Sequence, residues 1–161
     1  MEKKYKLCVV GAGRWGMNHV KALNRLEALG AVIDKNKTVT DQIASDFPFC
    51  KTFSSLEDAF DYGFDGYIVS SPPITHFEIA KKIIKHKKPV LVEKPITLSL
   101  KDSMELNKLA KANGVNLMVG HLLLFHPAFV KIKELIEDNR IGEVQYVYSN
   151  RLNLGSFRSD E

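Results

Sequence analysis

The glycine-rich segment from Lys6 to Gly16, which reads KLCVVGAGRWG, constrains the fold of this chain more than any other stretch. A short apolar run stops at Gly11, and Gly13 and Gly16 complete the spacing G-x-G-x-x-G. The run indicates a buried parallel strand, and the residues after it favour a helix start. Gly11 permits the tight turn, Gly13 lets a pyrophosphate approach the backbone, and Gly16 lets the helix pack on the sheet. The segment therefore predicts a dinucleotide-binding turn.

The second half of this fingerprint is an acidic residue at the end of the next strand, about 20 residues further on. Strand-like residues 28–33 end at Asp34, which stands at that position. A carboxylate there accepts the ribose hydroxyls of the adenosine and repels a 2′-phosphate, which favours NAD over NADP. In the alternative interpretation, Asp34 only caps a turn before Lys35. The motif fixes where the acidic residue should stand, about 20 residues after the glycines, and Asp34 stands there. We therefore favour the ribose role for Asp34.

Two large side chains, Arg14 and Trp15, lie inside the glycine motif. Their position predicts that both lie beside the cofactor. For Trp15 two interpretations stay open: its flat ring flanks the cofactor, or it packs at the edge of the domain.

Strand-like and helix-like segments alternate along most of the chain. The expected strands are 7–10, 28–33, 49–53, 65–70, 89–92 and 115–119, with helices or short helical turns between them. Ser55 with Asp58 and Ser99 with Asp102 have the capping-box spacing, and Gly114 suits a helix end. This alternation predicts an α/β protein with a Rossmann-type, doubly wound parallel sheet and a ligand at the carboxyl ends of the strands.

The pattern changes after residue 122. Pro127 suits the first position of another helix. Apolar and polar residues then alternate over 143–154, which is typical of an antiparallel strand with one apolar face. A single strand is not stable alone. We therefore expect a dinucleotide-binding domain over 1–122, and over 123–161 a linking helix and the first strand of an incomplete α+β domain. The chain is then a fragment, an excised piece or the product of a shortened gene.

Composition excludes several classes of protein. The chain has 161 residues, enough for one good-sized core, with 45% hydrophobic and 26% charged residues. No apolar run approaches the ~20 residues that span a bilayer. The N-terminus leads directly into the first expected strand, so we expect no signal peptide, and two cysteines make no disulfide framework. A cytoplasmic location is expected. The net charge of +4 is modest, and the lysines of 81–88 suit a solvated helix face better than a nucleic-acid site.

Three segments together resemble the Gfo/Idh/MocA oxidoreductases: VVGAGRWG, VSSPPITH and LVEKP. The resemblance covers nearly the whole chain. The tail, GHLLLFHPAFVKIKELI followed by IGEVQYVYSNRLNLGSFRSD, is similar to the sugar-nucleotide 3-dehydrogenase branch. Those enzymes oxidise the 3-hydroxyl of UDP-N-acetylglucosamine or its uronic acid. The resemblance implies an NAD-dependent oxidoreductase acting on a secondary hydroxyl of a sugar or UDP-sugar, and a parent protein that forms homo-oligomers.

The resemblance also implies roles for individual residues. Ser70, Pro72 and His76 would lie beside the ribose and nicotinamide, and Glu93 and Lys94 are the E-K of the E-K-P motif. Lys94 would approach both the nicotinamide and the reacting hydroxyl as the catalytic cation. Oxidising an alcohol requires loss of its proton, and a nearby cation stabilises the developing alkoxide. The alternative for a lysine here is a pair with Glu93 or a position in solvent.

Substrate contacts are implied at the following residues: His121, His126, Arg151, Asn153 and Arg158. His126 is equally suited to cap the helix that begins at Pro127, and the last three also fit ordinary solvation of an edge strand. No triad of ligands at metal spacing accompanies the histidines, so no metal is expected.

The catalytic Asp and His of the resembled family follow the position where this sequence ends. We therefore expect this chain to bind cofactor without turning over substrate. Two competing hypotheses are a non-catalytic nucleotide-binding or redox-sensing module, and an S-adenosylmethionine-dependent methyltransferase. The LVEKP segment favours the oxidoreductase over the methyltransferase.

Overall fold

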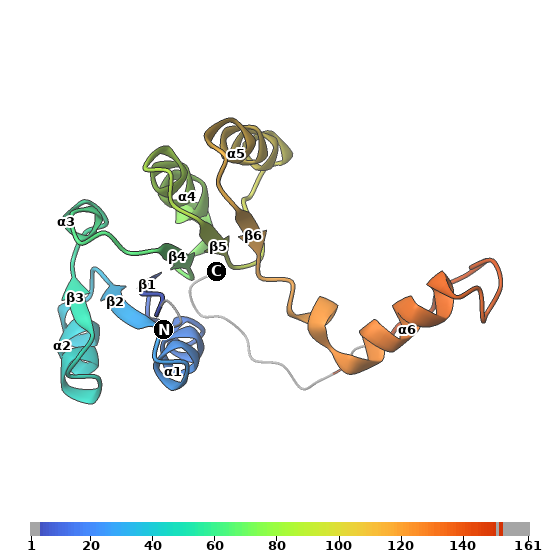
Figure 1. The fold of residues 1–161 in the computed structure, drawn as a ribbon, viewed down its shortest axis with the longest axis horizontal. Helices are drawn as coiled ribbons and strands as arrows, with labels where there is room; N and C mark the ends of the chain where they lie inside the picture. The colour runs from blue at the N-terminus through green and yellow to red at the C-terminus, as the bar shows by residue number, and fades with distance from the viewer. Residues whose placement is uncertain (1–3, 151, 153–161) are drawn as a thin grey trace. The chain divides into compact units, whose positions relative to one another are not determined.

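The computed structural model describes residues 4–150 and 152. Its main element is a six-stranded parallel sheet (Figure 1). The strands lie in the order β3-β2-β1-β4-β5-β6. They are β1 (Leu7–Val10), β2 (Leu29–Ile33), β3 (Lys51–Phe53), β4 (Gly66–Val69), β5 (Val90–Val92) and β6 (Leu117–Val119). Every pairing between neighbouring strands is parallel. The predicted Rossmann-type, doubly wound sheet is confirmed.

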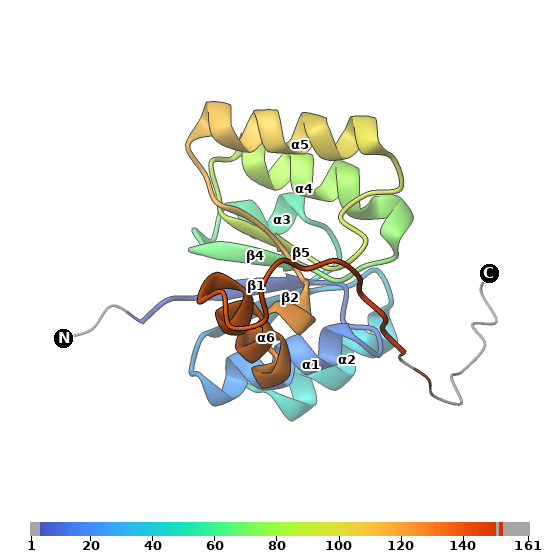
Figure 2. The same ribbon diagram turned by 90° about the vertical axis from the view of Figure 1, so that its right-hand side faces the viewer.

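Helices cover both faces of this sheet. They are α1 (Gly16–Arg25), α2 (Lys37–Asp46), α3 (Glu57–Phe60), α4 (His76–Lys85) and α5 (Leu100–Asn113), with a 3-10 turn η1 (Pro73–Thr75) before α4. Figures 1 and 2 show α1 and α2 on one face, and α4 and α5 on the other. The chain divides into two compact units, Met1–His121 and Leu122–Glu161, and the sheet belongs entirely to the first.

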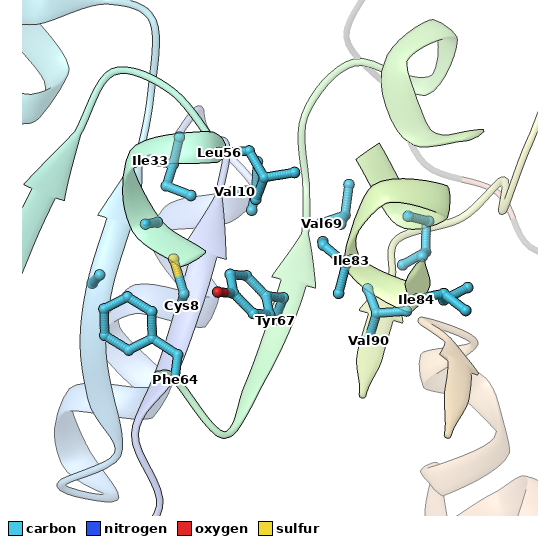
Figure 3. Close-up of a cluster of buried hydrophobic side chains, with 14 of the residues drawn as sticks. Cys8, Val10, Ile33, Leu56, Phe64, Tyr67, Val69, Ile83, Ile84 and Val90 are labelled. Atoms are coloured by element: carbon cyan, nitrogen blue, oxygen red, sulfur yellow. The ribbon is translucent and has the colours of Figure 1, made fainter. Parts of the chain in front are cut away.

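Alternating side chains of the strands supply both layers of the core. In β1, Cys8 and Val10 join one buried cluster, whereas Val9 joins the other. The first cluster, part of which is drawn in Figure 3, packs under α4 with Tyr67, Ile83 and other apolar residues. Because successive residues of a strand point to opposite faces, a sheet covered on both sides needs continuous apolar runs, and the sequence has them.

Several helix ends carry the residues expected of them. The hydroxyl of Ser99 accepts a hydrogen bond of 3.1 Å from the backbone N–H of Asp102, and Gly114 ends α5 with φ +63°. The Ser55 hydroxyl likewise accepts from the N–H of Asp58 at 3.2 Å. These bonds satisfy helix-end groups that have no partner within the helix.

The second unit contains a 3-10 turn η2 (Leu122–Phe125) and helix α6 (Pro127–Glu137). The strand predicted over 143–154 is wrong for the residues that the structure describes there, since 143–150 and 152 form no strand. The physical reason is that a strand needs a neighbour for its backbone hydrogen bonds, and no partner segment lies within the described part of this unit.

Candidate cofactor site

The candidate site lies at the carboxyl ends of β1 and β4, where the sheet order reverses direction. β2 and β3 lie on one side of β1, and β4, β5 and β6 follow on the other. Loops that leave neighbouring strands toward opposite faces of a sheet separate there and form a crevice for a ligand. The segments that meet at this edge begin at Gly11, Asp34, Ser70 and Glu93.

The three glycines of the first loop have different surroundings. Gly11 has φ +89°, and a Cβ there would lie 2.7 Å from the backbone nitrogen of Ser71. A Cβ on Gly16 would collide with the carbonyl oxygen of Gly11. Gly13 is exposed, and nothing lies within 4 Å of the position that its Cβ would take. Two glycines therefore serve close packing, while the third leaves open backbone, as a pyrophosphate contact requires.

The carboxylate of Asp34 faces the glycine turn. Its Oδ2 accepts a 2.9 Å hydrogen bond from the backbone N–H of Ala12, and its Oδ1 accepts one of 2.9 Å from the N–H of Asn36. The second bond caps the turn after β2, which is the alternative role that the sequence suggested for Asp34. A carboxylate has about four acceptor positions, so both bonds leave capacity for ribose hydroxyls.

The carboxylate of Glu93 is buried, with only 5% of the residue exposed. Its Oε1 lies 2.8 Å from Nε2 of His19, and its Oε2 accepts a 3.2 Å bond from the backbone N–H of Lys94. Burial alone would raise the pKa of Glu93. The bonds from His19, the Trp15 side chain and the Lys94 N–H outweigh burial and hold this pKa below its usual value.

Lys94 follows directly and extends outward. It is exposed, and its ammonium group makes no hydrogen bond or ion pair with any other residue in the described part of the chain. The alternative in which Lys94 pairs with Glu93 is therefore not what the structure shows, because Glu93 is bonded to other groups. An unpaired cation remains at the carboxyl end of β5.

His76 does not fit the contact with cofactor predicted for it. The residue is 1% exposed, and its two ring nitrogens lie 2.8 Å from the carbonyl oxygens of Pro95 and Ser71. A ring enclosed in this way binds two loops together and has no free nitrogen for a ligand. The VSSPPITH pattern correctly placed His76 at this edge of the sheet, but burial by neighbouring loops cannot be read from it.

The other predicted residues are distributed between the two units. Arg14, Trp15, Pro72 and His121 are exposed in the first unit. In the second unit, His126 caps α6, with Nδ1 accepting a 3.2 Å bond from the N–H of Ala128. This is the capping role named as its alternative. Three predicted substrate contacts lie outside the described residues: Arg151, Asn153 and Arg158.

Sequence reasoning overlooked His19. It lies on α1, one turn after Gly16 and beside the buried Val20. A polar side chain on the buried side of the first helix was the available signal, because such a group needs a polar partner inside the fold.

Within the described ranges, no cluster of three or more His, Cys, Asp or Glu side chains is arranged to hold a metal ion. The helices of the same ranges are also all too short or too polar to cross a membrane.

This site belongs to a known class of protein. The profile of the Gfo/Idh/MocA family, described as an oxidoreductase family with an NAD-binding Rossmann fold, matches residues 5–121. The match covers more than half of the 161 residues, so the chain belongs to this family and carries its NAD-binding domain.

Two inositol dehydrogenases are similar to this chain over most of its length. The chain is 33% identical to the NAD-dependent scyllo-inositol 2-dehydrogenase of Bacillus subtilis, over 91% of this chain and 44% of the relative. It is 32% identical to the inositol 2-dehydrogenase of Rhizobium meliloti, over 86% of this chain and 42% of the relative. The chain therefore spans less than half the length of these relatives.

A solved structure is also similar. The WlbA dehydrogenase of Bordetella pertussis, crystallised with NADH and UDP-GlcNAcA, superposes with a TM-score of 0.82 and 25% identity. The similarity covers 88% of this chain and 42% of WlbA.

Proposed function

We propose that this chain is the cofactor-binding part of an NAD-dependent dehydrogenase that oxidises a secondary hydroxyl of a sugar or cyclic polyol, with a UDP-sugar as the specific substrate class. The observation that supports this most directly is the combination of open backbone at Gly13, the Asp34 carboxylate and the unpaired Lys94 ammonium at one edge of the sheet. Each group matches a different part of the reaction.

The residues present fit NAD. The open backbone at Gly13 has room for a pyrophosphate, and α1 begins three residues later with its N-terminal N–H groups. Asp34 is bonded to the same turn through Ala12, which supports a role for its carboxylate in binding the ribose of the cofactor. Its charge disfavours a 2′-phosphate in that position. NAD, when bound, supplies the hydride acceptor for oxidation of the alcohol.

Lys94 supplies positive charge for the reacting oxygen. When an alcohol is oxidised, its oxygen loses a proton and gains negative character before the carbonyl forms. An ammonium group near that oxygen stabilises this charge and lowers the barrier. Lys94 is suited to the role because it is exposed and has no competing carboxylate in the described part of the chain.

The substrate class rests on the relatives. The two inositol dehydrogenases named above act on a cyclic polyol, and the WlbA complex contains UDP-GlcNAcA. Both kinds of ligand carry secondary ring hydroxyls, which is the chemistry that Lys94 suits. The tail of the sequence favours the UDP-sugar.

The test begins with calorimetric titration of the chain with NAD and NADP, where tighter binding of NAD is expected. The full gene product that contains this chain is then incubated with NAD and either UDP-GlcNAcA or scyllo-inositol, and NADH absorbance is followed. A rise with UDP-GlcNAcA supports the specific proposal, and a rise with scyllo-inositol alone redirects it to polyols. Failure of the chain to bind NAD would refute the proposal.

A further inference from the structure

Glu93 connects three parts of the first unit through one carboxylate. Its Oε1 lies 2.8 Å from Nε2 of His19 on α1, the helix that follows the glycine loop, and its Oε2 accepts a bond from the backbone N–H of Lys94. It also packs against the end of β6, since a Cβ on Gly120 would lie 3.0 Å from the carboxyl carbon and from both oxygens of Glu93. The carboxylate therefore points into the protein, whereas the neighbouring Lys94 points outward.

An anchoring role follows from the energetics of this arrangement. A carboxylate on a side chain that is only 7% exposed is costly unless donors satisfy it. Each of its oxygens has a partner here: Oε1 the His19 ring and Oε2 the Lys94 backbone N–H. His19 is itself mostly buried, with 19% of its side chain exposed, so this pair is shielded from solvent and has a defined geometry.

We propose that His19 is a positioning residue, which, through the Glu93 carboxylate, holds the Lys94 backbone in register with α1 and so ties the glycine turn, which leads into α1, to the turn that carries Lys94. This inference rests on the proposed function, since it assigns a purpose to joining these two turns. One dinucleotide must contact both of them, and a fixed spacing between them lowers the entropy lost on binding.

The sequence supplies a specific reporter for this network. Trp15 is the only tryptophan of the chain and stands at the N-cap of α1, one turn before His19, so intrinsic tryptophan emission reports on the start of this helix. Trp15 is 46% exposed, which makes its emission sensitive to changes in its contact with solvent. Emission and acrylamide quenching can therefore be measured without cofactor.

The experiment compares His19→Gln with His19→Met in the full 161-residue chain. The two side chains have similar size, but only glutamine carries an N–H at the ε position that can donate to Glu93. Asn18→Ala is the matched control, because Asn18 is exposed on the same helix and its side chain makes no hydrogen bond within residues 4–150 and 152. Each variant is measured for emission, for quenching and for NAD affinity by calorimetry.

The expected result is that His19→Met changes Trp15 emission, increases its quenching and weakens NAD binding roughly tenfold, the scale for losing one hydrogen bond to a buried charge. His19→Gln should retain most of the wild-type values, and Asn18→Ala all of them. Equal values for His19→Met and wild type would overturn the proposal. So would equal losses in the Met and Gln variants, because packing alone would then explain the role of His19.

A second arm covers the case in which both His19 variants fail to fold. Glu93→Gln removes the charge that binds both His19 and the Lys94 N–H, and NAD affinity should then fall several-fold; unchanged affinity would count against the network. Failure of the inference is distinguishable from failure of the proposed function. If wild type binds NAD but these variants bind equally well, only the network is wrong, whereas no NAD binding by wild type removes the function itself.

Discussion

The hydroxyl of Ser70, at the end of β4, donates a 2.7 Å hydrogen bond to the carbonyl oxygen of Gly11 at the end of β1. This bond crosses the point at which the strand order reverses and ties together the two loops that leave β1 and β4. The resemblance placed Ser70 beside the cofactor. The structure shows that its hydroxyl binds the glycine turn.

The glycines of this turn should respond differently to substitution. Gly13→Val should leave the free energy of unfolding nearly unchanged, because its Cβ position is open, but should abolish NAD binding by occupying the space for the pyrophosphate. Gly16→Ala should lower the free energy of unfolding by roughly 1–3 kcal/mol, since its Cβ meets the Gly11 carbonyl. Urea unfolding and calorimetry test both. Normal NAD binding by a folded Gly13→Val would show that this turn is not the phosphate site.

Asp34 should set the preference for NAD. At a concentration about 100 times its dissociation constant, NAD should stabilise the domain by about 2.7 kcal/mol. This raises the melting temperature by roughly 2–4 °C per kcal/mol, whereas NADP should have a smaller effect. Asp34→Ala should weaken the NAD effect and also lower the melting temperature without ligand, because the bond to Ala12 is lost. The exposed Asp61→Asn serves as control. Equal stabilisation by NADP in wild type would contradict this assignment.

Glu93 should make stability dependent on pH in the acid range. Its pKa in the folded chain is lower than the usual 4.5, so its contribution is fully present above that value and is lost as pH falls through the folded pKa. The Glu93→Gln variant should have a lower free energy of unfolding than wild type at about pH 7. It should also lack the part of the acid-induced fall in that free energy that protonation of Glu93 causes. Urea unfolding of both proteins from about pH 7 to 3 measures the difference. Parallel pH profiles for wild type and Glu93→Gln would rule out this role.

Lys94→Ala should slow the chemical step while it leaves folding and cofactor binding nearly unchanged. The side chain is exposed and unpaired within the described part of the chain, so the free energy of unfolding should change by less than about 0.5 kcal/mol. In the full gene product, alcohol oxidation should slow by roughly 10²-fold or more, because the charge on the reacting oxygen loses its stabilising cation. Stopped-flow measurement of NADH formation tests this, with the exposed Lys101→Ala as control. An unchanged rate would remove Lys94 from the mechanism.

Ser99→Ala tests whether the Ser99 side chain stabilises the N-terminus of α5 as its cap. Loss of the bond to the Asp102 N–H should lower the free energy of unfolding by about 1 kcal/mol. Thermal unfolding measures this, and Ser54→Ala is the matched control, because Ser54 is exposed and its side chain has no hydrogen bond to any described residue. Equal melting temperatures for the two variants would mean that Ser99 contributes nothing as a cap.

Local chemistry explains which features the sequence predicted well. The G-x-G-x-x-G turn, the Ser99 cap and the left-handed Gly114 each depend on residues close together in the chain. The alternation of apolar runs with amphipathic segments was enough for the doubly wound sheet, because such runs can be satisfied only when both faces are covered. The strand expected over 143–154 does not form at the described residues 143–150 and 152 for the opposite reason, since a strand depends on a partner elsewhere.

The sequence by itself determined the class of fold, the glycine turn, the acid that follows the second strand and the E-K-P segment. Only the tertiary structure decided which polar groups face a ligand and which face the protein. His76 and Glu93 lie in equally suggestive motifs, yet the first binds two loop carbonyls and the second binds the ring of His19. These partners are far apart in the chain, and the packing of β4, β5 and α1 brings them together. Burial then determines their roles, because a polar group removed from water must bond to whatever the fold places beside it.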